Sequence, residues 1–223
     1  MKKISILAII LVVCLSFTMI FSGCTKEITI QEGIDYFGDA IKEIQTTDTY
    51  YVRTVVVENA SNSKEYQLNV KGDKIHYTIV NNQGSNTTYV HTYYADNNKY
   101  VMPSKDVWNT VPMTKEAFLL EVGPYTREAI VARILAINTA MQTGALVPNK
   151  VTQGDYVTTY TFDDIGEEMS TRLGGTAKIG DKYPLTVETI VGRISKIVDS
   201  DTSPKIKYYI NYEGSKINIP KVA

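Results

Sequence analysis

The feature of the sequence that most constrains the fold is a series of short segments in which apolar and polar side chains alternate: 50–58, 65–71, 74–80, 87–95 and 99–102. They are rich in Val, Ile, Thr and Tyr, and clusters of Asn, Gly, Asp and Ser separate them. An alternation of period two with such boundaries predicts β-strands. Because the links are too short for a crossover helix, the strands are expected to form an antiparallel meander.

Apolar residues at helical spacing occur before and after this series. The first set predicts an amphipathic helix that ends near residues 46–48, and its apolar residues are Ile34, Phe37, Ile41 and Ile44. Later helices are predicted at 115–122, at 127–141, and from Asp163 or Asp164 to Leu173. Gly144 and the Gly174-Gly175 pair are expected to end the last two of these helices.

The remaining segments are expected to complete the sheet. Residues 103–112 are expected to be irregular, and further strands are predicted at 155–162, 185–198, 206–212 and 216–219. Helices set apart from a long antiparallel sheet are typical of the α+β class. A sheet of this length is expected to curl over its helices, so the predicted fold is a strongly curved antiparallel sheet, an incomplete β-barrel, wrapped around helices.

The N-terminus is typical of an export signal. Lys2 and Lys3 precede an apolar run over residues 4–21, which ends on Ser22-Gly23-Cys24. A short apolar run with small residues at its end predicts a signal peptide, and the alternative is a retained transmembrane helix, since the run is just long enough to span a membrane. The small residues before Cys24 resemble the lipobox of bacterial lipoproteins, although Phe21 stands where that family usually has Leu.

This resemblance implies that the Cys24 thiol is diacylated and that the chain is cut before Cys24. The chain then divides into a signal peptide (1–23), a lipidated tether (24–30) and one domain (31–223). Cys14 leaves with the signal, so the mature chain has one thiol and no internal disulfide. The expected location is the extracytoplasmic face of a cell membrane, with the diacylglyceryl group on Cys24 as the membrane contact.

Charge argues against nucleic acid as a partner. Loss of Lys2 and Lys3 lowers the basic residues from 23 to 21 against 24 acidic ones, so the mature formal charge is 21 − 24 = −3. Nucleic-acid binding requires a basic patch, which the sequence lacks. Tyr outnumbers Phe by 16 to 5, which suits a sheet with one wet face, because a tyrosine ring packs while its hydroxyl reaches water.

The layout also resembles the lipoprotein-carrier superfamily, the LolA/LppX-like lipoproteins, over about residues 30–220. Three stretches carry the resemblance: the entry helix with residues 49–53, residues 93–101 followed by Trp108, and residues 192–197 with 208–212 and 217–220. The resemblance implies a half-barrel around helices and no catalytic residues. Some members of that superfamily carry acyl chains or lipidated proteins in the mouth of the barrel, and others act as sensors or as partners of cell-envelope enzymes, so the resemblance implies one of these roles.

A hydrophobic cleft between sheet and helix is the predicted ligand site. Its helix wall would be formed by Ile130, Ile134, Ile137 and Met141, and its sheet wall by Val55, Val57, Leu68, Val70, Tyr77 and Ile79. The alternative is that these residues simply form the core, which is the commoner role of an apolar stripe.

Other candidate chemistry is weaker. A four-residue loop at 82–85 would place His76 directly opposite His91, but two histidines fall short of a zinc site, so no metal or cofactor is expected. Glu167 and Glu168 suit the first turn of a helix better than an acid–base pair. Asp199 and Asp201 lack the rest of a calcium loop. No phosphate loop, nucleophile elbow or zinc-helix motif occurs, so a hydrolase is disfavoured.

The sequence therefore favours a non-enzymatic, membrane-anchored lipoprotein that binds a lipid, an acyl chain or a lipidated ligand in its cleft. The alternative is a protein–protein module that scaffolds or regulates a cell-envelope enzyme or signalling partner. That alternative predicts a filled interior and an exposed aromatic patch near Trp108 and residues 93–100.

Overall fold

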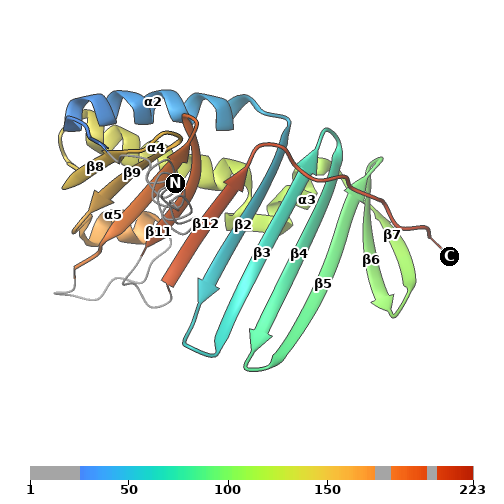
Figure 1. Ribbon diagram of the computed structural model, residues 1–223. Helices are drawn as coiled ribbons and strands as arrows, with labels where there is room; N and C mark the ends of the chain where they lie inside the picture. Colours follow the sequence, from blue (N-terminus) through green and yellow to red (C-terminus); the bar gives the residue numbers. More distant parts are fainter. Residues whose placement is uncertain (1–25, 174–181, 200–204, 223) are drawn as a thin grey trace, which may run out of the picture.

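The computed structural model describes residues 26–173, 182–199 and 205–222 (Figure 1). Its main feature is one antiparallel sheet of 12 strands in the order β1-β8-β9-β10-β11-β12-β2-β3-β4-β5-β6-β7. The sheet does not close on itself, because β1 and β7 are its two edges. The strands are β1 (Lys26–Glu27), β2 (Thr49–Val57), β3 (Asn62–Lys71), β4 (Lys74–Gln83), β5 (Asn86–Ala95), β6 (Asn98–Ser104), β7 (Val107–Pro112), β8 (Lys150–Gln153), β9 (Val157–Phe162), β10 (Leu185–Ile190), β11 (Arg193–Asp199) and β12 (Lys205–Asn211).

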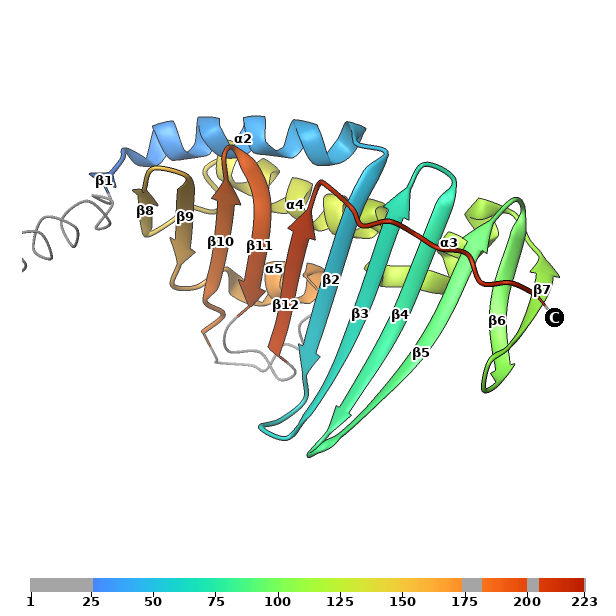
Figure 2. The ribbon, with the colours of Figure 1, turned by 45° about the vertical axis from the view of Figure 1, so that its right-hand side comes forward.

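Helices cover one face of this sheet, as Figure 2 shows. They are α2 (Ile30–Thr46), α3 (Lys115–Val122), α4 (Arg127–Gln142) and α5 (Gly166–Arg172), with a 3-10 turn, η1 (Gly123–Tyr125), between α3 and α4. The curved α+β half-barrel expected from the sequence is therefore confirmed. Among the described residues, no helix combines the length and the apolar character that crossing a membrane requires.

Side chains at the helix starts explain where three of the helices begin. Thr29 and Glu32 form a capping box before α2, in which each side chain accepts a hydrogen bond from the backbone N–H of the other residue. Thr114 and Thr126 cap α3 and α4 in the same manner, each accepting from the backbone three residues on. These caps fix the starts of the two helices that face the centre of the sheet.

The core lies between the sheet and the helices. Phe37 of α2 packs edge-to-face on Tyr160 of β9, with ring centroids 5.1 Å apart. On the central strands Val52 is paired with Leu68, and both are buried. Successive residues of a strand point to opposite faces of the sheet. Every second residue counted from Val52 on β2, and from Leu68 on β3, therefore faces the helices.

Several local predictions were wrong. Residues 107–112, expected to be irregular, form β7 after a two-residue turn, and the four residues of β8 were not predicted as a strand. The single strand expected at 185–198 is a hairpin, because Val191 and Gly192 form a turn between β10 and β11. The strand expected at 216–219 is absent: this stretch crosses the outer face of the sheet and is tied to β3 by Ser215, which exchanges hydrogen bonds with Asn69.

The described part of the expected tether, residues 24–30, is attached to the sheet. Lys26 pairs with Gln153 and Glu27 with Thr152, and α2 begins at Ile30. Only Thr25 stands between Cys24 and this first strand, which limits the Cα–Cα reach from Cys24 to Lys26 to about 7 Å. Cys24 itself lies outside the described residues.

Candidate functional site

The predicted sheet wall is divided between the two faces of the sheet. Leu68, Val70, Tyr77 and Ile79 face the helices, since Leu68 is paired with Tyr77 and both share the face of Val52. Val55 and Val57 do not share this face, because they alternate with the helix-facing residues of β2. The two valines therefore lie on the outer face of the sheet and cannot form a wall shared with α4.

The predicted helix wall is part of the core. The four residues of α4 belong to the core that α2 and the sheet also form, and at most 1% of each is exposed: Ile130, Ile134, Ile137 and Met141. Along α4 the space between sheet and helix is thus filled by side chains. These four residues therefore pack as core, which was one of the two interpretations that the sequence left open.

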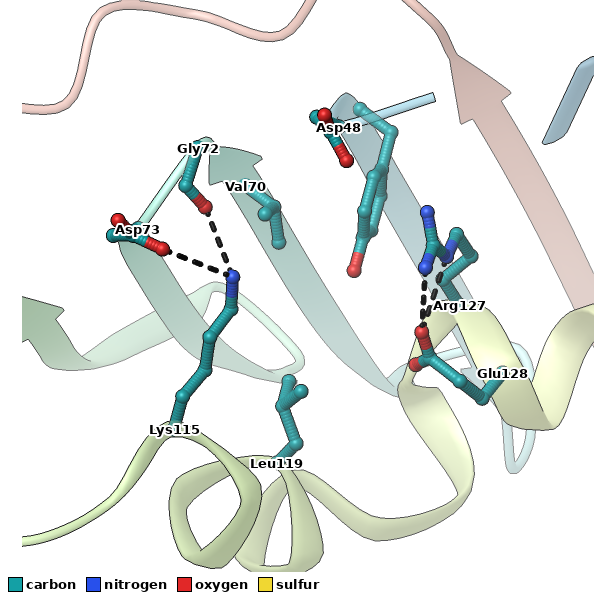
Figure 3. Close-up of a pocket in the computed structure, with 9 residues that line it drawn as sticks. Asp48, Val70, Gly72, Asp73, Lys115, Leu119, Arg127 and Glu128 are labelled. Carbon is teal, nitrogen blue, oxygen red and sulfur yellow. Dashed lines mark hydrogen bonds and ion pairs between the residues drawn. The ribbon is translucent and has the colours of Figure 1, made fainter. Parts of the chain in front are cut away.

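A cleft between sheet and helices does exist at one end of the strands (Figure 3). It has a volume of about 340 Å³ and lies between the start of β2, the β3–β4 turn, and the first turns of α3 and α4. Tyr50 and Val70 supply apolar surface from the sheet, and Leu119 supplies it from α3. Val70 is the one residue of the predicted wall that lines this cleft.

Charged side chains form the rim of the cleft. Lys115 Nζ lies 3.1 Å from the Gly72 carbonyl oxygen, to which it donates, and 3.7 Å from the Asp73 carboxylate. Arg127 donates to the Thr47 carbonyl oxygen at 2.5 Å and to the Glu128 carboxylate at 2.9 Å. With Asp48, the rim carries two cations and three carboxylates, so it offers both hydrogen-bond donors and acceptors to a ligand.

Tyr50 joins the charged rim to the apolar interior. The Arg127 guanidinium lies 5.2 Å from the centre of the Tyr50 ring, and the Tyr50 side chain is buried. Burial, and then the negative charge of Glu128, raise the pKa of the Tyr50 hydroxyl above its usual value. The hydroxyl therefore remains protonated and can donate a hydrogen bond.

The two histidines meet on the outer face, but not as the loop model predicted. The β4–β5 turn has two residues, so His76 is paired with Tyr93 and Thr78 with His91. His76 and His91 are thus diagonal neighbours, with Nε2 and Nδ1 3.1 Å apart and the Thr78 hydroxyl within 3.1 Å of both. Burial, and then the proximity of His91, lower the pKa of His76 from 6.5 to about 4.

Aromatic rings extend this pair into an outer aromatic cluster, which consists of His76, Tyr89, His91, Tyr93 and Trp108. Tyr93 stacks on His76 with ring centroids 4.1 Å apart, and Trp108 meets Tyr93 edge-on at 5.3 Å. Tyr89 stacks beside His91 at 6.1 Å and is largely exposed. The sequence predicted an exposed aromatic patch near Trp108 and residues 93–100, but Trp108 and Tyr93 are half-buried in this cluster, which lies on the outer face of the sheet.

The acidic candidates are not gathered into a site. Glu167 and Glu168 lie in the first turn of α5, and Glu168 pairs with Arg172 across one helical turn at 2.6 Å. Asp201 lies outside the described residues. Within the described ranges, no group of three or more His, Cys, Asp or Glu side chains is arranged to hold a metal ion.

The sequence did not single out Leu119, Lys115 or Arg127. The available signal for these positions was a pair of helix-capping threonines, Thr114 and Thr126. Each precedes a predicted helix, so the residues that follow it lie at the end of that helix. The position of the β3–β4 turn opposite those helix starts follows from the tertiary structure alone.

No protein-family model matches the chain, and no curated protein matches its sequence. Among solved structures, the crystal structure of LprF from Mycobacterium bovis is similar, with a TM-score of 0.47 and 10% sequence identity. The similarity covers 89% of this chain and 100% of that one.

Proposed function

We propose that this protein is a non-enzymatic lipoprotein, held on the extracytoplasmic face of a membrane by acyl chains on Cys24, that binds an amphiphilic ligand in the cleft of Figure 3. The ligand is a lipid, an acyl chain or a lipidated molecule. The observation that carries this proposal is the cleft itself, which joins apolar surface from Tyr50, Val70 and Leu119 to a charged rim. Its volume of about 340 Å³ falls within the usual size of ligand sites.

Both apolar and charged side chains line the cleft, which supports an amphiphile as the ligand. An acyl segment placed on Leu119, which is only partly buried, removes apolar surface from water and so contributes to affinity. Lys115 and Arg127 are positioned to donate to an anionic or carbonyl group at the rim. The carboxylates beside them favour a headgroup that also carries a donor, such as an ammonium or a hydroxyl group.

The test compares two adjacent leucines of α3. Leu119 lines the cleft, whereas Leu120 does not and is 81% exposed. Leu119→Trp fills the cleft and should abolish displacement of a fluorescent fatty acid, while Leu120→Trp should leave it unchanged. Lipid extraction and mass spectrometry of the wild-type chain should recover a stoichiometric amphiphile. The proposal fails if neither lipid recovery nor displacement is seen, or if both variants bind like the wild type.

The anchor has a separate test. Mass spectrometry of the mature chain should find acyl chains on Cys24, and Cys24→Ser should prevent both acylation and cleavage before residue 24. A mature chain with an unmodified Cys24 thiol would contradict membrane anchoring without affecting the test of the cleft.

The second candidate function is that of a protein–protein module, and the outer aromatic cluster favours it. Interfaces are enriched in Tyr and Trp, and Tyr89 of this cluster is largely exposed. A photoreactive crosslinker at Tyr89 should then capture a specific envelope protein that the same crosslinker at Leu120 does not. Equal capture from both positions would remove the support for this function.

A further inference from the structure

Two hairpin turns project exposed apolar side chains at the end of the sheet where β1 begins, at Lys26. They are the β8–β9 turn, with Tyr156 and Val157, and the β10–β11 turn, with Ile190 and Val191. Ile190 is paired with Val157, and the Val191 N–H donates to the Tyr156 carbonyl oxygen at 2.8 Å. The four residues therefore form one continuous group, which we call the hairpin tips.

The hairpin tips are poorly explained by folding. Tyr156 is 73% exposed and Val191 is 70% exposed, so neither side chain contributes much to the core. Val191 also has φ 51°, a left-handed conformation that β-branched residues avoid, and it is followed by Gly192 at φ 72°. A two-residue turn of this kind favours Asn, Asp or Gly at its first position.

Another turn of the same sheet shows the expected chemistry. Asp96 and Asn97 connect β5 to β6 with φ values of 51° and 56°, and both are residues that tolerate this conformation. At the matching position of the β10–β11 turn, Val191 adds strain and exposes an isopropyl group. Neither the turn conformation nor packing among the described residues explains a valine at this position.

The position of the tips relative to the start of β1 bears on what they contact. Lys26, the first residue of β1, pairs with Gln153, the last residue of β8, so the start of β1 lies beside the β8–β9 turn. Neighbouring strands lie about 4.8 Å apart, so Lys26 is within a few strand spacings of Tyr156 and Val191. Only Thr25 separates Cys24 from Lys26 in the sequence, so a lipid on Cys24 would be tethered close to the start of β1 and to the tips.

We infer that the hairpin tips insert into the interface of the bilayer that holds the lipid anchor. This inference rests on the proposed anchoring through Cys24, and it adds which face of the domain meets the membrane. Tyr suits the headgroup region, since its ring is apolar and its hydroxyl reaches water, and Val and Ile suit the acyl boundary. Charged residues of both signs flank the tips, namely Asp155, Arg193 and Lys26, which fits a zwitterionic lipid surface.

The experiment uses the full acylated chain reconstituted in phosphatidylcholine vesicles. An environment-sensitive fluorophore attached to the Tyr156→Cys variant should emit at shorter wavelength in the vesicles than in buffer without lipid or detergent. Brominated lipid in the vesicles should quench this emission. The same fluorophore on Leu120→Cys is the matched control, because Leu120 is exposed on α3, a helix that lies beside β3 to β5 and is several strands away from β8 to β11 along the sheet (Figure 2). It should show neither the shift nor the quenching.

Adding Val191→Asn to Tyr156→Cys removes an apolar contact while placing a favoured residue in the turn, so the fold is preserved. This variant should lower the ratio of inserted to non-inserted protein about tenfold, because one aliphatic side chain is no longer buried in the bilayer. The quenching should fall accordingly. Equal quenching at residues 156 and 120, or no effect of Val191→Asn, would overturn the inference.

The failure of anchoring is read separately from the failure of insertion. Mass spectrometry reports acylation of Cys24, whereas quenching reports contact of the tips. An acylated chain without quenching contradicts the inference alone, and a chain that is not acylated contradicts the proposed function. Quenching that requires a second protein in the vesicle would assign the tips to a protein partner and would also overturn the inference.

Discussion

At the scale of single residues, Val191 carries a cost that can be measured. A non-glycine residue in the left-handed region costs about 1–2 kcal/mol, and Asn reduces this cost because its side chain bonds locally. Val191→Asn should therefore raise the free energy of unfolding by about 1 kcal/mol, measured by urea denaturation. Asp96→Asn, in a turn that already has a suitable residue, is the matched control and should change it by less. A destabilised Val191→Asn would show that the isopropyl group packs usefully in the free domain.

His76 gives a pH dependence with a defined sign. Its pKa falls from 6.5 to about 4 in the folded chain, so between those values the unfolded chain binds a proton that the folded chain does not. The free energy of unfolding should therefore decrease as the pH falls through this window, and this group should have no effect above it. In urea denaturation at about pH 7 and about pH 5, His76→Gln should show a smaller decrease than the wild type. An equal decrease in both proteins would refute the assignment to His76.

The histidine pair also shows where sequence reasoning reached its limit at this scale. The alternation in β4 and β5 correctly placed His76 and His91 on one face, because side-chain parity survives a shift of two residues. The direct pairing was wrong because Gly84 and Ser85 form the whole loop, and turn length is not encoded in the alternation. Contact survived because diagonal neighbours on a sheet are still within reach of an imidazole.

At the scale of elements, α4 packs against α2 and contributes to the core. Ile134 of α4 is fully buried in that core, so Ile134→Ala should leave a cavity and cost about 3 kcal/mol of stability. Leu135→Ala is the control on the same helix, since Leu135 is only partly buried, and it should cost less. Thermal unfolding followed by circular dichroism would measure both. Similar losses would indicate that α4 is loosely packed and that an open cleft extends along it.

Elements were predicted well where the pattern is local and poorly where it is interrupted. β2 to β6 alternate over many residues and have polar turns, so they were found with small errors at their ends. The β10–β11 hairpin was missed because Val191 is a strand former placed in a turn. Residues 216–219 alternate like a strand, yet they cross the sheet and find no ladder partner, which only the tertiary structure decides.

At the scale of the whole molecule, one end of the sheet carries both proposed contacts. Since all neighbouring strands are antiparallel, the hairpin tips, the start of β2 and the β3–β4 turn lie at the same end of their strands (Figure 2). Asp48, Gly72 and Asp73 place the cleft at that end. A domain held by its tips would therefore present the mouth of the cleft toward the membrane side of the molecule.

This arrangement predicts that the cleft exchanges ligand with its own membrane. A fluorescent fatty acid placed in the vesicles that hold the acylated chain should load faster than the same fatty acid supplied in separate vesicles, because anchoring raises its effective concentration at the cleft. Val191→Asn should slow the loading from the shared vesicles, Leu119→Trp should abolish loading from both sources, and Leu120→Gln should change neither. Equal rates from shared and separate vesicles would mean that ligand reaches the cleft through water, and that the common end of the sheet has no role in its delivery.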